Sequence, residues 1–453
     1  MLNDTIVAIS SAIGEGAIGI VRMSGENAYK ILNQIFSPTS DFKSRQMYYG
    51  VIKKEDVVLD EVMAVYMKAP KTYTKEDIVE IYCHGGIISI KRVLNIILEN
   101  GARMAEPGEF TQRAFLNGRL DLSQAEAVMD LLSAKTEKGF DIAYNQLEGS
   151  LGHKIDYIRN KLLKVVAHLE VCIDYPEEDI EDMTYEEIES SFKIVKNELE
   201  VLLNHSDNGR IIRDGIKIAI IGKPNVGKSS LLNALLKEAR AIVTDIAGTT
   251  RDIIEEHLNI QGIPIRIIDT AGIRQTSDQI EKIGVERSKE IFNEADMILF
   301  VLNASEVLSD EDKELIELVS NKKSIIVMNK IDLEQKIELE HVEETFKDRS
   351  IVKTSLLNEQ GILNVEQAIV DMVYDGDISS SNEQLLSNTR HIQAVKEALK
   401  SIEAAHLATL NKMPYDFIEV DTMDCLDYLG KVTGETVEGD IVKQIFGQFC
   451  LGK

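Results

Sequence analysis

Apolar and polar positions alternate in different ways along the chain, and the alternation predicts its elements. In residues 1–118, short apolar runs punctuated by glycine are typical of β-strands. These runs are TIVAIS, GAIGIVRMS, VMAVYMKA and DIVEIYCH, whereas ISIKRVLNIILENGA has apolar residues at helical spacing. The pattern therefore predicts a compact α+β domain over residues 1–118.

Longer helical patterns occupy residues 119–214 and 377–453. Ser123 with Glu126, and Thr184 with Glu187, have the spacing of a capping box. Two sets of apolar residues follow a helical period: Ile188, Phe192, Val195, Leu199 and Leu202, and then Ile392, Val395, Leu399 and Ile402. Since neither segment alone closes a core, we predict one discontinuous all-α helical domain built from both.

Residues 215–376, between those helical segments, have a different pattern. The strand-like runs IKIAIIG, PIRIID, SIIVM and SIVKT alternate with helical runs. This alternation is typical of a doubly wound parallel sheet. We therefore predict an α/β domain over residues 215–376, inserted into the helical domain.

The net charge of the chain limits its direct binding to nucleic acids. Its 453 residues carry 50 Lys and Arg against 76 Asp and Glu, a net charge of −26. Residues 1–118 contribute −1 of this, and residues 119–214, 215–376 and 377–453 contribute −10, −10 and −5. Because free-standing nucleic-acid binders usually present a basic surface, we expect only weak, salt-sensitive RNA binding by the chain alone.

The cysteines and the apolar runs indicate the compartment. Cys83, Cys172, Cys425 and Cys450 have neither the spacing of a zinc site nor that of a disulfide scaffold. No apolar run has the length of a membrane span, and the first residues lack the regions of a signal peptide. We expect a cytoplasmic protein.

The segment GKPNVGKS at residues 222–229 matches the phosphate-binding pattern GxxxxGK[ST] between a strand and a helical run. In such a loop the glycines turn backbone N–H groups toward the phosphates. Lys228 neutralises the β and γ oxygens, and Ser229 offers a hydroxyl to Mg²⁺. This segment predicts a nucleoside triphosphate site.

Three further motifs follow in the order expected of a GTPase. TDIAGTTRD supplies Thr250 as a second Mg²⁺ ligand, and DTAG supplies Asp269 for the Mg²⁺ and Gly272 for the γ-phosphate. In NKID, Asp332 can accept two hydrogen bonds from guanine, which adenine cannot donate. The predicted GTP-binding residues are Asn225, Val226, Gly227, Lys228, Ser229, Ser230, Thr244, Asp245, Ile246, Ala247, Gly248, Thr249, Thr250, Asp269, Thr270, Ala271, Gly272, Asn329, Lys330, Asp332, Ser355 and Leu356.

The hydrolytic machinery departs from that of many GTPases, because Ile273 stands where a glutamine often orients water. Asn225 fits two interpretations, a ligand for a monovalent cation or a residue that only holds a turn. Glu281 also fits two, an acid that orients water or a surface helix charge. The residues alone leave both interpretations of Asn225 open and favour a surface helix charge for Glu281.

These motifs, together with EIYCHGG, PGEFTQRAFLNGRLDLSQAEAV and the tail QIFGQFCLGK, closely resemble the MnmE (TrmE) family of bacterial tRNA modification GTPases. The resemblance covers essentially all of the chain. It implies an N-terminal tetrahydrofolate-binding domain that dimerises, a discontinuous helical domain and an inserted Ras-like P-loop G domain. This agrees with the division read from the apolar pattern.

The resemblance also implies a reaction. Family members are expected to act as homodimers, in a heterotetramer with the flavin-dependent partner MnmG (GidA), which brings FAD and much of the tRNA contact. Together they add an aminomethyl or carboxymethylaminomethyl group to C5 of the wobble uridine of certain tRNAs. The implied one-carbon source is a 5,10-methylene- or 5-formyl-tetrahydrofolate.

Site residues carried over by the resemblance fall into three groups. The implied folate contacts are Arg22, Glu80, Arg119 and Lys453, which could otherwise be ordinary surface charges. The implied K⁺ ligands are Asn225, Thr244, Ile246 and Thr249, and Glu281 is implied to act in water activation beside Lys228. Cys450 is a candidate catalytic thiol, or a small buried apolar residue.

Two rival functions share part of this pattern. A ribosome-assembly GTPase would have the same nucleotide motifs but would bind no folate. A folate-dependent aminomethyltransferase would use the N-terminal domain but would need no G domain. Folate binding distinguishes the family's function from that of a ribosome-assembly GTPase. Dependence of the reaction on GTP distinguishes it from that of an aminomethyltransferase.

Overall fold

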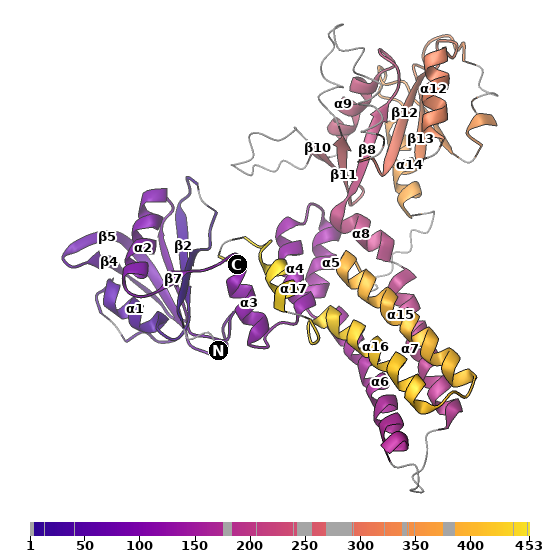
Figure 1. Ribbon diagram of the computed structural model, residues 1–453. Coiled ribbons are helices and arrows are strands. Elements are labelled where there is room, and N and C mark those ends of the chain that lie inside the picture. The colour runs from indigo at the N-terminus through magenta and orange to yellow at the C-terminus, as the bar shows by residue number, and fades with distance from the viewer. Residues whose placement is uncertain are drawn as a thin grey trace. The chain divides into compact units, whose positions relative to one another are not determined.

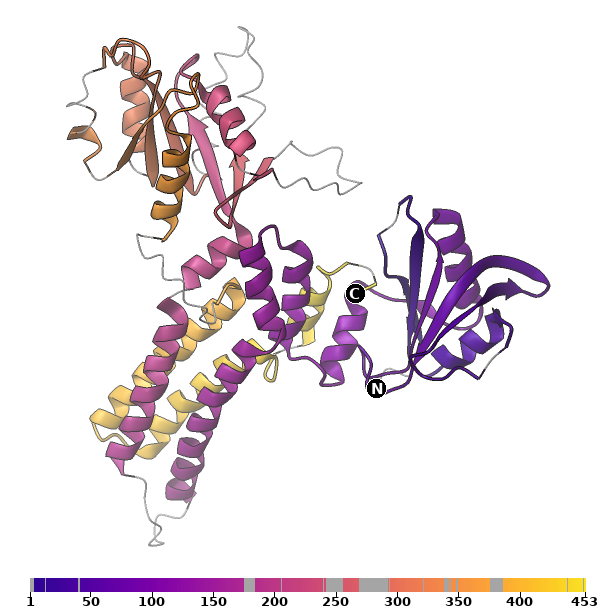
Figure 2. The same ribbon diagram turned by 180° about the vertical axis from the view of Figure 1, so that it is seen from behind.

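The computed structural model describes residues 4–12, 14–39, 41–174, 184–204, 206–238, 240–241, 256–268, 292, 294–320, 322–337, 342, 344–347, 349–374, 386–437, 439–450 and 452–453. The chain divides into two compact units. One comprises residues 1–129, 146–196 and 397–453, and the other comprises 130–145 and 197–396. Figure 1 and Figure 2 show the elements of both from opposite sides.

A seven-stranded sheet opens the first unit, in the order β3-β4-β5-β6-β2-β1-β7. All neighbours are antiparallel except β1 and β7, which are parallel. The strands are β1 Ile6–Ile9, β2 Ile18–Ser24, β3 Phe36–Ser37, β4 Met47–Lys54, β5 Val57–Met67, β6 Ile78–His84 and β7 Arg103–Met104. Helices α1 (Ala28–Ile35) and α2 (Ile87–Glu99) share one apolar core with this sheet, so the predicted α+β domain is confirmed.

Of the remaining helices of the first unit, α3 (Glu109–Leu116) lies within residues 1–118, and the others come from both helical parts of the sequence. These others are α4 Leu122–Ser133, α6 Ser150–Asp174, α7 Tyr185–Asn204, α15 Thr389–Leu410, α16 Tyr415–Thr433 and α17 Gly439–Phe446, with the ends of α4, α7 and α15 reaching into the second unit. Helices α6 and α16 lie side by side (Figure 1, Figure 2). Arg159 of α6 donates to the Leu426 carbonyl oxygen at 2.9 Å, which confirms that the two helical segments pack together.

One predicted helix cap is confirmed and the other is wrong. Thr184 and Glu187 bond reciprocally: the Thr184 N–H donates to Glu187 Oε2 at 2.9 Å, and the Glu187 N–H donates to Thr184 Oγ1 at 3.3 Å. Ser123, in contrast, lies inside α4. Asp121 caps that helix by accepting the Gln124 N–H at 2.8 Å, while the Gln124 side chain accepts the Asp121 N–H at 2.9 Å.

The second unit contains a seven-stranded sheet in the order β14-β13-β12-β8-β11-β10-β9. Its strands are β8 Ile216–Ile221, β9 Arg240–Ala241, β10 Glu256–Ile260, β11 Ile263–Ile268, β12 Met297–Asn303, β13 Ser324–Asn329 and β14 Ser350–Lys353. Its helices are α5 Glu137–Leu147, which extends into the first unit, α8 Ser206–Asp214, α9 Lys228–Glu238, α12 Asp310–Val319 and α14 Ile362–Tyr374.

Alternate residues of the central strands bury on opposite faces of this sheet. Leu299 and Val327 pack with residues of α9 and α14, whereas Phe300 and Ile326 pack with Val319 of α12. Strands β8, β11, β12, β13 and β14 are parallel neighbours, and β9 and β10 form an antiparallel edge. The predicted doubly wound α/β fold is confirmed.

None of the helices in the described part of the chain combines the length and the hydropathy that crossing a membrane requires.

Candidate functional site

The phosphate-binding loop lies where the sequence predicts it, between β8 and α9. Gly222 has φ +154° and Gly227 has φ +112°, both in the region that favours glycine. A Cβ on Gly222 would lie 2.4 Å from the Val301 carbonyl oxygen, and one on Gly227 would lie 2.3 Å from Asn329 Nδ2. Backbone conformation and space therefore both require glycine at these two positions.

Two side chains of this loop bear on phosphate chemistry. The Lys228 ammonium donates to the carbonyl oxygens of Gly222 at 2.6 Å and Lys223 at 2.7 Å, and its burial lowers the pKa of the amine. Asn225 has a left-handed backbone, with φ +63°, and is exposed. Asparagine tolerates this conformation better than most residues, so the turn interpretation of Asn225 is compatible with its backbone.

Asn329 connects the phosphate loop to the loops that follow β13 and β14. It is 3% exposed, and its Nδ2 donates to the Val226 carbonyl oxygen at 2.8 Å. Its Oδ1 accepts the Leu356 N–H at 3.2 Å. One buried amide thus links three segments that are far apart in sequence.

Asp332 and Ser355 lie at the same edge of the sheet. The buried Ser355 hydroxyl donates to Asp332 Oδ1 at 2.6 Å, which orients the exposed carboxylate. Because β8, β11 and β13 run parallel, their carboxyl ends share this edge, where ligands of open α/β sheets bind. The structure therefore brings Val226, Asn329, Asp332, Ser355 and Leu356 together at this edge, and their role in GTP binding stays a prediction.

The remaining predicted nucleotide residues lie outside the described residues. They are Thr244, Asp245, Ile246, Ala247, Gly248, Thr249, Thr250, Asp269, Thr270, Ala271, Gly272 and Glu281. Strand β11 ends at Ile268, directly before Asp269, at the carboxyl edge of the sheet. The roles assigned to these twelve residues stay predictions.

A second polar cluster lies on the N-terminal sheet. Arg22 of β2 and Glu80 of β6 are cross-strand partners, and Arg22 Nη2 lies 2.8 Å from Glu80 Oε1. The Tyr82 hydroxyl donates to Glu80 Oε2 at 2.6 Å, and burial together with this bond raises the pKa of Tyr82 to about 12. The Glu80 carboxylate is therefore held between two fixed donors.

The C-terminal residues reach this cluster. The Phe110 N–H donates to the Lys453 carbonyl oxygen at 3.2 Å, and the Gly108 N–H donates to the Cys450 carbonyl oxygen at 3.4 Å. Burial and the nearby Arg22 guanidinium lower the pKa of the Lys453 amine. The tail thus adds a second cation, Lys453, near Arg22, and Cys450 of the same tail is exposed.

Aromatic rings that the sequence did not single out organise these cations. The Arg22 guanidinium lies 5.9 Å from the Tyr73 ring centroid and 5.8 Å from that of Phe110. Arg119 lies 4.7 Å from the same Tyr73 ring. Phe110 stands in a motif that carried the family resemblance, whereas Tyr73 had no recognisable signal.

Comparison with known proteins identifies the family of the chain. The family model described as "MnmE helical domain" matches residues 122–450, and "GTP-binding protein TrmE N-terminus" matches residues 5–119. The chain belongs to the MnmE (TrmE) family. MnmE proteins named "tRNA modification GTPase MnmE" from Alkaliphilus oremlandii and Clostridioides difficile are 53% and 50% identical to it, over 100% of both chains in each case. That of Bacillus subtilis is 50% identical over 99% of this chain and 100% of its own.

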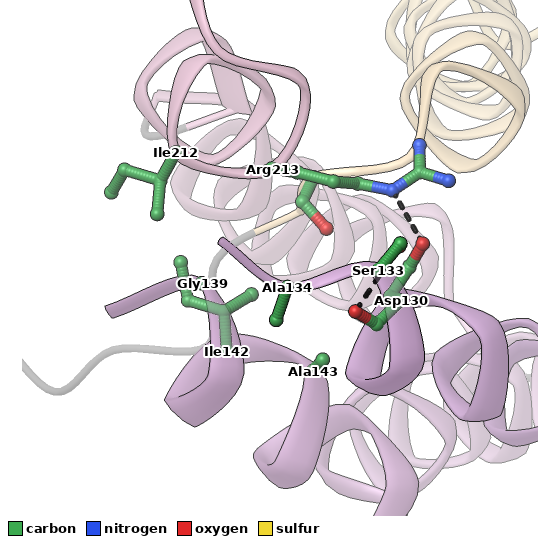
Figure 3. A pocket seen from close by; sticks show the side chains of 9 residues that line it. Asp130, Ser133, Ala134, Gly139, Ile142, Ala143, Ile212 and Arg213 are labelled. Carbon is green, nitrogen blue, oxygen red and sulfur yellow. Dashed lines mark hydrogen bonds and ion pairs between the residues drawn. The ribbon is translucent and has the colours of Figure 1, made fainter. Parts of the chain in front are cut away.

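One further hollow of this MnmE-family chain is separate from its nucleotide loops. It is lined by residues at the end of α4, in α5 and in α8, and by Ser387 (Figure 3). Arg213 Nε of α8 donates to Asp130 Oδ1 at 2.8 Å across it. None of the described phosphate-loop or guanine-loop residues lines it. We interpret it as a packing feature that anchors α8, the helix that leads into β8.

Proposed function

We propose that this chain is a GTP hydrolase that acts in tRNA modification. The observation that supports the proposal is the Asn329 bridge, because it links the phosphate loop to the loops that we predict to bind guanine. The role in tRNA modification is proposed from the full-length similarity to proteins named tRNA modification GTPases. GTP and Mg²⁺ are the implied ligands.

The described residues suit the binding of GTP with Mg²⁺. Backbone N–H groups of residues 225–230 and the Lys228 ammonium would hold the phosphates, and the Ser229 hydroxyl would bind the Mg²⁺ together with Thr250. Asp332, oriented by Ser355, would accept the guanine N1–H and 2-amino protons. Glu281 would orient water for attack on the γ-phosphate.

We further propose that K⁺ activates hydrolysis, with Asn225, Thr244, Ile246 and Thr249 as ligands. The exposed, left-handed Asn225 has no side-chain hydrogen bond within the described residues, so its amide oxygen can turn toward a cation. A cation there would neutralise charge that develops on the β–γ bridging oxygen, as an arginine finger does. The loop of residues 244–252, once ordered by the bound GTP, would then bring two G domains of a dimer together.

Turnover should rise steeply when Na⁺ is replaced by K⁺ at constant ionic strength, and this rise should be absent in Asn225→Ala. The expected loss is about 10²-fold or more, because a charge-neutralising group of this kind is worth 10³–10⁵ in GTPases. Phosphate release under saturating GTP measures it. Asn225→Asp, which keeps an oxygen ligand, is the matched control, and equal wild-type rates in both salts would refute the role of K⁺.

A reduced folate fits the Arg22 cluster. Arg22, Arg119 and Lys453 supply cations for a glutamate tail, and the Glu80 carboxylate can pair with pterin N–H donors. Tyr73 and Phe110 offer ring surface for a flat heterocycle. When bound, such a folate would supply a one-carbon unit next to Cys450.

Arg22→Ala should weaken binding of 5-formyl-tetrahydrofolate by about 10- to 100-fold, since a hydrogen bond to a charged group is worth roughly 1.5–3 kcal/mol. Titration calorimetry with the full chain measures this. Arg92→Ala, an exposed arginine change on α2, is the control and should bind folate as the wild type does. Unchanged affinity in Arg22→Ala would place the folate elsewhere.

The finer reaction that we propose needs partners. A flavin-dependent MnmG (GidA) subunit would join a homodimer of this chain to form a heterotetramer, and C5 of the wobble uridine would receive an aminomethyl or carboxymethylaminomethyl group. The sheet face opposite α1 and α2 exposes large apolar side chains, which suits a second copy of the chain. These are Ile18, Met47, Tyr49 and Met63, exposed by 56%, 49%, 70% and 39%.

Nucleoside analysis of tRNA tests the proposed function as a whole. A strain that lacks this chain should lose the modified wobble uridine, and the wild-type gene should restore it, whereas Lys228→Ala should not. Retention of the nucleoside, together with a defect in ribosomal subunits, would favour a ribosome-assembly GTPase. Restoration by Lys228→Ala would favour a GTP-independent aminomethyltransferase.

A further inference from the structure

One face of α6 is basic although the surrounding sequence is acidic. Residues 150–168 carry four Lys and Arg against one Asp, within a segment, 119–214, whose net charge is −10. At 3.6 residues per turn, the side chains named below fall within roughly 100° of the helix circumference. We call this set the α6 stripe: His153, Lys154, Tyr157, Lys161, Lys164 and His168.

The α6 stripe faces away from the bundle core. The opposite face buries Ile155, Ile158 and Leu162, each 0% exposed. Arg159 also points to that side, where it pairs with Glu435 and bonds Leu426 of the C-terminal helices. Every member of the stripe, in contrast, is half-buried or exposed, so the stripe is a surface of the helical bundle.

Two lysines of the stripe lie over an aromatic ring, and two lack acidic partners within the described residues. The Lys154 and Lys161 ammonium groups lie 5.8 and 5.1 Å from the centroid of the Tyr157 ring, which is 47% exposed. Within the described part of the chain, neither Lys161 nor Lys164 forms an ion pair with a carboxylate. Other helix lysines behave differently, since Lys193 pairs with Glu189 at 2.5 Å and Lys431 with Asp427 at 2.7 Å.

We propose that the α6 stripe is a contact surface for the phosphate backbone of the tRNA. The stripe extends over about 22 Å at 1.5 Å per residue, enough to face several successive phosphates. A row of lysines beside an aromatic ring is the composition that sequence-independent RNA contacts use. A membrane surface fits less well, because it would require large aliphatic side chains among the cations.

The inference rests on tRNA being the substrate, which is part of the proposed function. It also accounts for an acidic protein that acts on RNA, because the contact is small and the chain as a whole carries a net charge of −26. With up to three lysine–phosphate contacts, the logarithm of the binding constant should fall with the logarithm of salt concentration with a slope of about −2 to −3.

The test is tRNA binding by the full chain without nucleotide, measured by fluorescence anisotropy between 50 and 200 mM KCl, a fourfold range over which a slope of −2 to −3 weakens binding by about 16- to 64-fold. The double variant Lys161→Gln/Lys164→Gln should bind about ten- to fiftyfold more weakly at the low-salt end, with a slope smaller by about 1.5. The control Lys193→Gln/Lys431→Gln changes the net charge equally on two other helices and should stay within twofold of the wild type. Circular dichroism and GTP turnover should match the wild type in both variants.

Three outcomes would overturn the inference. These are binding by Lys161→Gln/Lys164→Gln within twofold of the wild type, an equal loss in the control pair, or competition by polyglutamate as effective as that by tRNA. The last would instead indicate an acidic protein partner. If the wild type binds no tRNA even at low salt, the stripe proposal fails, whereas the proposed function fails only if tRNA nucleosides are unchanged in the deletion strain.

Discussion

Replacing Asp332 with asparagine should lower the affinity of this chain for GTP by about a hundred- to a thousandfold and should raise its affinity for xanthosine triphosphate. The Asp332 carboxylate can accept both the N1–H and the 2-amino protons of guanine. Each hydrogen bond to a charged group is worth roughly 1.5–3 kcal/mol, and each 1.4 kcal/mol is tenfold. An asparagine amide would instead face the 2-amino group with its own N–H₂, whereas xanthine offers an oxygen there.

Calorimetric titration with both nucleotides measures this exchange of specificity. Asp310→Asn is a matched control, because that carboxylate is 98% exposed on α12 and lies outside the described site. Ser355→Ala should give a smaller loss for GTP, since it removes only the hydroxyl that orients Asp332 at 2.6 Å. Equal GTP affinity in wild type and Asp332→Asn would show that the base is read elsewhere.

Arg113→Met should destabilise the N-terminal sheet by about 3–5 kcal/mol, the usual effect of removing one partner from a buried ion pair. Arg113 is 1% exposed and donates to Asp4 Oδ1 at 2.7 Å, Glu109 Oε1 at 2.9 Å and Glu76 at 3.2 Å. Methionine fills similar volume but leaves the buried Glu109 carboxylate with fewer donors. Hydrogen exchange of β1 and β7 amides should accelerate, while β12 and β13 serve as an internal reference.

The effect of acid on this network has a definite sign. Burial alone would raise the pKa of Glu109, but hydrogen bonds from Arg103 and Arg113 outweigh it and hold that pKa below its ordinary 4.5. The carboxylate therefore stabilises the fold above pH 4.5, and that contribution is lost as pH falls through the lowered value. Arg113→Met should weaken this acid dependence. The Arg103 side chain is 42% exposed, so Arg103→Met should lower the free energy of unfolding less than Arg113→Met does. An equal loss in the two variants would contradict the importance of burial.

The nucleotide loops were predictable because their information is local. A strand, a glycine loop and a helix follow one another in GKPNVGKS, and each parallel strand delivers its motif to the same sheet edge. The Asn329–Val226 bond was not predictable, since it depends on how closely the β13 loop approaches the phosphate loop across 103 positions of sequence.

The N-terminal part shows other limits of sequence reasoning. The wrong cap at Ser123 arose because Asp121 and Gln124 form the same reciprocal pattern two residues earlier, and the structure selects that pair. The hairpin of β4 and β5 was not predicted. In MYYGVIKKEDVVLD, lysines and acidic residues interrupt the apolar run, and apolar and polar residues do not alternate as they do in a half-buried strand. Arg22 and Glu80 came from the family resemblance, and only their register shows them to be direct cross-strand partners.

The pairing of α6 with α16 sets the order in which the molecule can assemble. Arg159 bonds Leu426 and Glu435, which are 267 and 276 positions further along the chain. The G domain, in contrast, is contiguous from β8 to α14, so its contacts are comparatively local and need not wait for the last helices. During synthesis from the N-terminus, the N-terminal sheet and then the G domain can fold while α6 still lacks its partner. The helical bundle therefore completes its packing last. Until α16 is made, the apolar face of α6 stays exposed, and this is where chaperones would be needed most.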